Sequence, residues 1–182
     1  MPKTALILVD IQNDYFEDGL WPVPEMDRVA ANAARLLAAA RTGGDLVVHI
    51  RHENQIPEVP FLQPGTAGAE IHALVAPAGG EAVLTKHRAN SFHGTGLLDM
   101  LHEAGVEAVT ICGAMSQMCI DATARAAGDF GFQVTVAEDA CGAKEMEFGG
   151  VEVSAAQVHA AFMMPLAMGY AQVVKTEDLI GA

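Results

Sequence analysis

Short apolar runs rich in β-formers alternate with longer Ala-rich segments along the whole chain. The runs at 4–9, 45–50, 82–85, 106–112, 132–137 and 171–175 predict six strands. The first run, TALILV, is apolar throughout, which is typical of a strand buried on both faces. Apolar residues at helical spacing predict helices over 27–41, 95–104, 117–130 and 153–168.

This alternation defines the expected fold class. Strands that alternate with helices favour parallel strands joined by right-handed crossovers, with helices on both faces of the sheet. We therefore expect an α/β protein with a doubly wound, mostly parallel six-stranded sheet in a three-layer, Rossmann-like arrangement. Residues 1–182 are expected to form a single domain, since no repeat or interdomain linker interrupts the pattern.

Two local features refine the element boundaries. Asp27 is predicted to cap the first helix, and Gly43-Gly44 to end it. Residues 51–80 lack periodicity and hold four of the prolines, so we expect a long loop with one short helical turn near 70–74. A loop of this length serves as a lid, a binding loop or an oligomer arm.

Composition and charge exclude several classes of function. The formal net charge is −13 without a Lys/Arg block, which disfavours binding to nucleic acid or to an anionic membrane surface. No apolar run reaches the roughly 18 residues of a membrane span, and residues 1–25 lack a signal-peptide pattern, so a cytoplasmic location is expected. Three cysteines without a CxxC pair favour neither a disulfide framework nor a zinc knuckle.

Cys119 is the residue whose position in the sequence most clearly indicates a catalytic role. It follows the apolar run 106–112 through a short Gly-containing segment and opens the predicted helix 117–130. A helix N-terminus carries partial positive charge and unpaired N–H groups, which stabilise a thiolate and offer donors to an oxyanion. A small buried cysteine without chemistry is the alternative reading.

Asp10 and Lys86 stand at the ends of the first and third predicted strands, and Cys119 lies just past the end of the fourth. Ligands of doubly wound sheets bind outside the carboxyl ends of the strands, so these side chains share the edge where a site forms. Asp10 could take the thiol proton and return it to a leaving amine, while Lys86 stabilises negative charge. Backbone N–H groups of Met115 and Cys119 could bind an oxyanion. Taken one at a time, each residue has an alternative interpretation without chemistry: Asp10 could cap a helix or a turn, and Lys86 could be a solvated surface lysine.

Three motifs carry a family resemblance. LILVDIQNDYFEDG (6–19), KHRANSFHGTGL (86–97) and ICGAMSQMCIDATARAAGDFGFQVTVAEDACGA (111–143) resemble the isochorismatase-like cysteine hydrolases. That superfamily includes nicotinamidases, N-carbamoylsarcosine amidohydrolases and isochorismatases. The resemblance implies a catalytic triad of Asp10, Lys86 and Cys119. It also implies a cis peptide between Ala114 and Met115 that turns the Met115 N–H toward the oxyanion.

The candidate substrate-binding residues lie near this triad. Gln12 resembles the polar pocket residue of the family, and Phe16 and Trp21 could wall an apolar pocket. Ala114 and Met115 would line the pocket from the turn before the nucleophile. The alternatives are an ordinary loop amide at Gln12 and aromatic side chains that only pack their loop onto the core.

The predicted site contains no metal and no other cofactor. Metal-dependent nicotinamidases carry an Asp-x-His motif after the second strand, whereas this chain reads His49-Ile50-Arg51-His52-Glu53 and lacks the Asp. His49, His52 and Glu53 remain the alternative ligands.

The predicted function is hydrolysis of a C–N bond in a small amide or carbamoyl compound through a thioester on Cys119. The first alternative is a vinyl-ether hydrolase of the isochorismatase type. We rank it second because the family members that hydrolyse isochorismate mostly have longer chains or a carrier domain, for which 182 residues leave no room. The second is a non-catalytic thiol sensor or binding protein. The segment 153–168 is apolar nearly all round, which predicts a homo-oligomer, a dimer or a tetramer.

Overall fold

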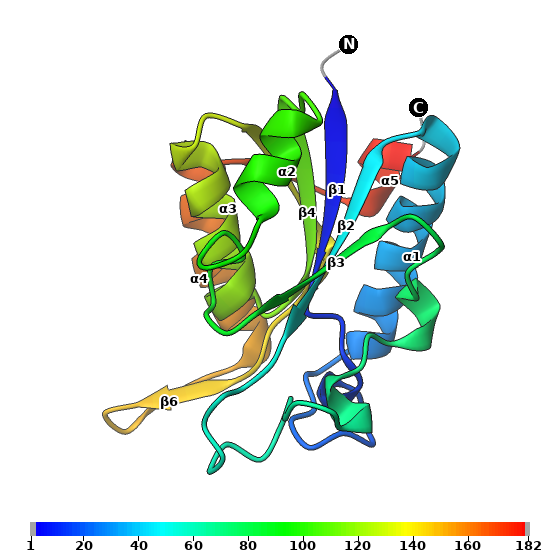
Figure 1. Ribbon diagram of the computed structural model, residues 1–182. Helices are drawn as coiled ribbons and strands as arrows, with labels where there is room; N and C mark the ends of the chain where they lie inside the picture. Colours follow the sequence, from blue (N-terminus) through cyan, green and yellow to red (C-terminus); the bar gives the residue numbers. More distant parts are fainter. Residues whose placement is uncertain (1–2, 181–182) are drawn as a thin grey trace.

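The computed structural model describes residues 3–180 and contains a six-stranded parallel sheet in the order β3-β2-β1-β4-β5-β8 (Figure 1). Every pairing within this sheet is parallel, which confirms the predicted α/β fold class. The bounds of its strands are β1 Thr4–Val9, β2 Leu46–His52, β3 Ala82–Lys86, β4 Ala108–Ala114, β5 Gln133–Gly142 and β8 Gln172–Val174.

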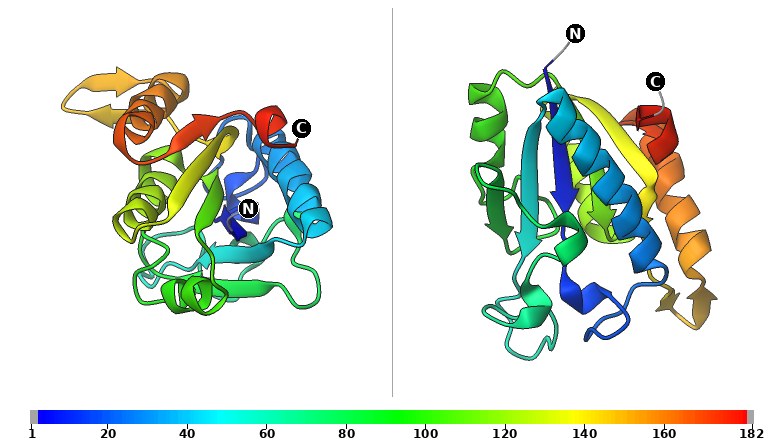
Figure 2. Two further views of the ribbon diagram at one scale, coloured as in Figure 1. Left: turned by 90° about the horizontal axis from the view of Figure 1, so that it is seen from above. Right: turned by 90° about the vertical axis from the view of Figure 1, so that its right-hand side faces the viewer.

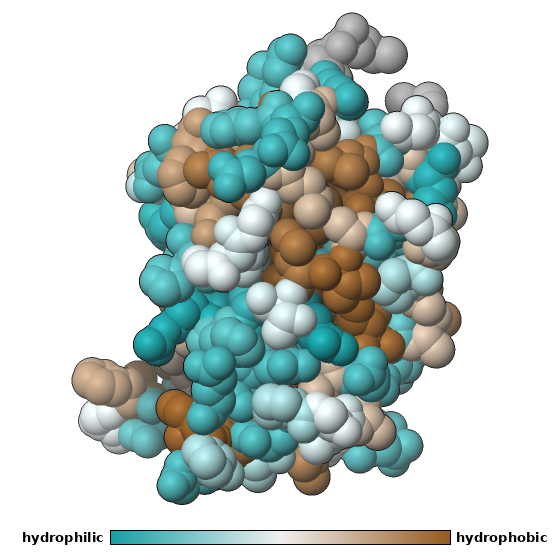
Figure 3. All heavy atoms as spheres, viewed as in Figure 1, coloured by the Kyte–Doolittle hydropathy of each residue, from teal (hydrophilic) through white to brown (hydrophobic). Residues whose placement is uncertain are grey.

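Helices cover both faces of the sheet (Figures 1 and 2). On one side lie α1 (Met26–Gly43) and the short α5 (Thr176–Ile180). The other side carries α2 (Leu97–Glu103), α3 (Asp121–Asp129) and α4 (Ala155–Gly169). The space-filling view shows apolar residues gathered near the middle of the face on which the edge strand β3 lies (Figure 3).

β1 lies at the centre of the sheet and supplies both hydrophobic cores. Ala5, Ile7 and Val9 belong to the core beneath α2, α3 and α4, whereas Leu6 and Leu8 pack against α1. Side chains of a strand alternate between faces, so an apolar run without polar interruptions requires a layer on each side. The burial of all five residues is what the TALILV pattern predicts.

Several boundaries differ from the sequence prediction. The residue that caps α1 is Glu25, in the left-handed region at φ 59°, and Asp27 lies inside the first turn, so the prediction of Asp27 as the cap is wrong. Gly44 ends this helix at φ 75°, as predicted. β5 runs on to Gly142, which places Cys141 within a strand rather than in a loop.

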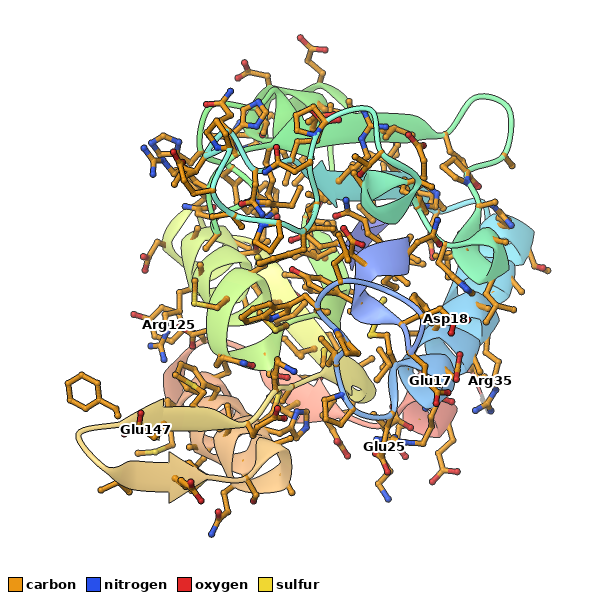
Figure 4. The ribbon with its side chains drawn as sticks, turned by 90° about the horizontal axis from the view of Figure 1, so that it is seen from below. Glu17, Asp18, Glu25, Arg35, Arg125 and Glu147 are labelled. Atoms are coloured by element: carbon orange, nitrogen blue, oxygen red, sulfur yellow. The ribbon has the colours of Figure 1, made fainter. Side chains whose placement is uncertain are left out.

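A two-stranded antiparallel hairpin was not predicted. It consists of β6 (Met146–Phe148) and β7 (Val151–Val153), and it projects from the body next to α4 (Figures 1 and 4). Glu147, labelled in Figure 4, lies on this hairpin. Phe148 is 88% exposed, so the hairpin contributes little to either core.

The long segment 53–81 packs onto the loop that follows β1. It contains two short 3₁₀ turns, Ala67–Ala69 and Ala73–Val75, the second of which overlaps the predicted helical turn. Aromatic stacking joins the two loops, with Phe16 on His72 at 3.7 Å and Trp21 on Phe61 at 4.7 Å between ring centroids. The stacked parts of both loops therefore lie next to each other, whereas the end of the segment 53–81 returns to the start of β3. Among the described residues, no helix is long and apolar enough to cross a membrane.

Candidate active site

The nucleophile turn connects β4 directly to α3. After Ala114 comes the cis peptide Ala114–Met115, as the resemblance implied, and then a π-helical turn, Ser116–Ile120, that runs into α3. Gly113 precedes it at φ 129°, where a Cβ would overlap the carbonyl of Val9 on β1. Cys119 thus lies at the beginning of a helix, as the sequence predicted.

Asp10, Lys86 and Cys119 meet at the carboxyl edge of the sheet. Lys86 Nζ lies 2.7 Å from Asp10 Oδ2 and 3.2 Å from Cys119 Sγ. None of the three residues is more than 6% exposed. The solvated reading of Lys86 is therefore wrong, and the three groups can exchange protons without reaching bulk water.

Burial and mutual charge set the protonation of this cluster. Burial acts to lower the pKa of Lys86, but the negative charge of Asp10, and that of Cys119 whenever its thiol is ionised, outweigh burial and raise the pKa above its usual value. Burial, with a further contribution from Asp10, raises the pKa of the Cys119 thiol, against which Lys86 acts in the opposite direction. The resting state is therefore a protonated thiol beside an ion pair of Asp10 and Lys86.

Lys86 has two further neighbours. Its Nζ lies 3.1 Å from His52 Nδ1 and donates to the carbonyl of Arg88 at 3.0 Å. Asp10 itself sits at φ 52°, and its Oδ1 has no hydrogen-bond partner among the described residues. A carboxylate oxygen without a partner is free to accept a hydrogen bond or a proton.

The potential ligand atoms of Asp10, His52 and Cys119 lie within 4.8 Å of one another, which is close enough for a metal ion. The Lys86 ammonium, however, lies within 3.2 Å of each of them. A second cation at this point would meet a positive charge in a buried setting, so these residues do not fit a metal. His49 and Glu53 are engaged elsewhere, with Glu81 and Arg51 respectively.

The structure gives the predicted binding residues clear local partners. The Gln12 amide donates to the carbonyls of His52 and Ala69 and accepts from the His52 N–H, so it joins β2 to the long loop. Phe16 is buried against His72, whereas Trp21 is partly exposed, with Lys144 Nζ 5.5 Å from its ring centroid. Contact of any of them with a substrate stays a prediction.

Two residues near the triad were not singled out by the sequence. Tyr15 is buried, and burial together with the nearby charges of Cys119 and Asp10 raises its pKa. Gln117 donates from Nε2 to the Lys144 carbonyl at 3.3 Å, and its buried Oε1 has no partner among the described residues. Gln117 stands two positions before Cys119, but only the structure reveals its free acceptor.

α4 supports the nucleophile turn from outside. His159 Nδ1 lies 2.9 Å from the buried Ser116 Oγ, and His159 Nε2 lies 3.3 Å from Glu138 Oε2. Ser116 Oγ also donates to the Gly142 carbonyl. These bonds fix the first residue of the turn between β5 and α4.

A parallel α/β sheet that joins a thiol, an ammonium and a carboxylate at its carboxyl edge defines the cysteine hydrolase class. Comparison with known proteins gives the family: the model of the isochorismatase domain matches residues 4–178. The chain therefore belongs to the isochorismatase family.

Relatives cover nearly the full chain. The uncharacterized isochorismatase family protein YddQ of Bacillus subtilis is 43% identical over 97% of this chain and 98% of its own length. Maleamate amidohydrolase of Pseudomonas putida is 31% identical over 97% of this chain and 84% of its own. A crystal structure of an Oleispira antarctica protein assigned to the isochorismatase hydrolases superposes with a TM-score of 0.95. That match has 46% identity and covers 100% of this chain and 97% of the other.

Proposed function

We propose that this protein hydrolyses the C–N bond of a small amide or carbamoyl compound through a thioester on Cys119. The observation that carries the proposal is the position of Lys86 Nζ, in contact with both Asp10 Oδ2 and Cys119 Sγ. A relative whose name is maleamate amidohydrolase supports the choice of an amide.

The first half-reaction forms the thioester. Asp10 takes the thiol proton as Sγ attacks the carbonyl carbon of the substrate, and Lys86 stabilises the negative charge that moves from the carboxylate to the sulfur. The tetrahedral intermediate then collapses, the C–N bond breaks, and Asp10 returns the proton to the leaving amine. Cys119 is left acylated and Asp10 ionised.

The second half-reaction restores the enzyme. Water enters the place left by the amine, Asp10 takes one of its protons, and the hydroxide adds to the thioester carbon. When the C–S bond breaks, the proton passes from Asp10 to the sulfur and the carboxylic acid leaves. The same carboxyl group thus acts as base and acid in turn.

Backbone donors and nearby side chains complete the proposed site. The N–H groups of Met115 and Cys119 would form the oxyanion hole, since both belong to the nucleophile turn. The free Oε1 of Gln117 suits an N–H donor of an amide or ureido group. Phe16 and Trp21 would border the apolar part of the substrate.

A screen for ammonia release tests the proposal. Small amides, ureido acids and carbamoyl compounds would be incubated with the wild-type chain and with Cys119→Ala, and active compounds would be followed by mass spectrometry of the Cys119 peptide. We expect ammonia release that Cys119→Ala abolishes, together with an acyl adduct on Cys119.

Other outcomes would overturn it. Release of pyruvate from isochorismate, without turnover of any amide, would indicate vinyl-ether hydrolysis. Reversible oxidation of Cys119 by peroxide, without turnover of any compound, would indicate a thiol sensor. Ammonia release that persists in Cys119→Ala would exclude the thioester.

A further inference from the structure

The Lys86 ammonium is surrounded by more hydrogen-bond acceptors than it has protons to donate. It carries three N–H groups, yet four acceptor atoms lie within 3.2 Å of Nζ. They are Asp10 Oδ2 at 2.7 Å, the Arg88 carbonyl at 3.0 Å, His52 Nδ1 at 3.1 Å and Cys119 Sγ at 3.2 Å. Of these four, Asp10 and Cys119 are the partners that exchange a proton in the proposed reaction.

The protonation of His52 follows from its other neighbour. His52 Nε2 lies 3.1 Å from Asn54 Oδ1, and Asn54 Nδ2 donates to the Phe61 carbonyl at 2.8 Å. Because the amide nitrogen of Asn54 is committed to a carbonyl, its oxygen faces His52, and Nε2 must carry the ring proton. Nδ1 is then a lone pair directed at Lys86.

We propose that His52 is a positioning residue of the active site, whose neutral imidazole accepts a hydrogen bond from the Lys86 ammonium and holds it in place beside Asp10 and Cys119. Its meaning for catalysis rests on the proposed function. Two neutral acceptors, His52 Nδ1 and the Arg88 carbonyl, hold two of the ammonium protons throughout. The third proton is shared between Asp10 and Cys119.

This arrangement accounts for every proton in the thiol activation step. At rest the third ammonium proton points to the Asp10 carboxylate. The neutral thiol of Cys119 is a weak acceptor and requires no hydrogen bond from the ammonium. When the thiol proton has moved to Asp10, the thiolate becomes the stronger acceptor and receives the third ammonium proton. Nζ need not leave its place, because His52 and the Arg88 carbonyl have not changed.

A protonated His52 would break this anchor. Its Nδ1–H would face the ammonium without an acceptor and with a like charge 3.1 Å away. Cys119 lies within 4.8 Å of the ring as well, and of the groups that shift the pKa of His52, Asp10 and Asn54 favour the charged ring while Lys86 and His87 oppose it. Burial, followed by the charge of Lys86, lowers the pKa of His52, which keeps the imidazole neutral at pH values where a free histidine begins to charge.

Alkylation of Cys119 by iodoacetamide tests the proposal without any substrate. The rate would be measured at pH 7.5 by mass spectrometry of the Cys119 peptide in wild type, His52→Leu and His52→Asn. His52→Leu removes the acceptor, and we expect its alkylation rate to fall about tenfold, the equivalent of one lost hydrogen bond to a charged group. His52→Asn offers Oδ1 in place of Nδ1 and should stay within about threefold of wild type.

His93→Leu is the matched control, because His93 is an exposed histidine outside the cluster. Equal alkylation rates in His52→Leu and wild type would overturn the proposal, and so would a rate in His52→Asn as low as that in His52→Leu. Because alkylation needs no substrate, a negative ammonia screen leaves this result untouched. If amide turnover is found, His52→Leu should lower kcat and leave KM within about twofold.

A measurement on the wild-type chain decides the matter if His52→Leu does not fold. ¹⁵N NMR of histidine-labelled protein at pH 7.5 should show a neutral His52 ring protonated at Nε2 and bare at Nδ1. A ring protonated at Nδ1 at that pH would overturn the proposal.

Discussion

The backbone N–H of Leu62 donates to Asp14 Oδ2 over 2.6 Å, and this bond joins two loops that lie 48 residues apart in the sequence. The other oxygen, Oδ1, accepts from the N–H of Leu20. Gly68 packs so closely against the carboxylate that a Cβ there would overlap it. Asp14 is therefore the point at which the loop after β1 and the long loop 53–81 are fixed to each other.

Asp14→Ala should destabilise the protein. It leaves the buried N–H of Leu62 without a partner, which costs about 1–3 kcal/mol. Urea unfolding of this variant would show the loss, while the same change at the exposed Asp18 should leave the free energy of unfolding within about 0.5 kcal/mol of wild type. Equal stability of the two variants would contradict this role of Asp14.

Gly113→Ala should affect both folding and the nucleophile turn. A Cβ there would overlap the Val9 carbonyl, and φ 129° is a conformation that alanine rarely adopts. We expect the free energy of unfolding to fall by more than about 1 kcal/mol, measured by thermal or urea denaturation. Gly79→Ala is the control, since nothing lies within 4 Å of a Cβ at that position. A Gly113→Ala protein as stable as the Gly79→Ala protein would disprove the argument.

The ion pair in the active site should also matter for stability. Lys86→Met leaves the Asp10 charge buried without its partner, which costs about 3–5 kcal/mol. The double variant Asp10→Asn/Lys86→Met removes both charges and should be more stable than Lys86→Met alone. For comparison, Asp121→Asn breaks the more exposed pair with Arg125 and should cost less than about 1 kcal/mol. Unfolding curves that rank Lys86→Met level with Asp121→Asn would refute this reading.

Glu81 should make the stability depend on acid pH. Its hydrogen bonds from Arg41, from the Ala78 N–H and from His49 lower the pKa of Glu81 to about 2, against a usual value near 4.5. Because the folded-state pKa is depressed, the contribution of Glu81 is fully present above about pH 5 and is lost as the pH falls toward 2.

The test of this dependence is a comparison of Glu81→Gln with wild type. The difference in free energy of unfolding should be largest at neutral pH and should shrink between about pH 5 and 2. Glu58→Gln, a change at an exposed glutamate of the long loop, should show no such trend. A difference that does not vary with pH would rule out Glu81 as the titrating group.

The prediction of a homo-oligomer rests on exposed apolar side chains of α4 and of the hairpin. Only Val158, Met163 and Leu166 of α4 are buried, whereas Met164 and Met168 of this helix and Phe148 of the hairpin are exposed. Large apolar side chains left exposed in this way favour association with a second chain. Light scattering should give a mass of at least two chains. Phe148→Asp combined with Met164→Glu should lower it, whereas Leu20→Asp, at an exposed leucine elsewhere, should not. A wild-type mass of one chain at all concentrations would disprove the prediction.

The sheet and the triad could be predicted from the sequence because both depend on strong local signals. The apolar run of β1 requires a layer on each face, and the ends of parallel strands bring Asp10 and Lys86 to one edge whatever the loops do. Cys119 follows β4 by five residues, so its position is also set by the sheet. The cis peptide at Ala114–Met115 came from the family resemblance alone.

The remaining features depend on tertiary contacts that no pattern reveals. The hairpin around Gly149-Gly150 has a turn signal, but its strands are exposed and lack a buried face to mark them. The path of loop 53–81 is set by Gln12 and Asp14, whose side chains bond to residues about 40 to 57 positions away. Likewise, the sequence does not reveal that His52 Nδ1 is a hydrogen-bond acceptor, because the contact with Asn54 determines the tautomer of the ring.

Cys119 is attached to the sheet through the short turn between β4 and α3, and Asp10 and Lys86 stand at the ends of β1 and β3. The two loops 11–25 and 53–81, in contrast, bond to each other through Asp14 and Leu62 and stack through Phe16 and His72. The pair of loops is thus a module: exchanged together for those of another family member, they should change which compound is accepted while the reacting atoms stay where they are. Exchange of one loop alone would separate Asp14 from Leu62 and Phe16 from His72, so adaptation to a new compound requires the two segments to vary as one unit.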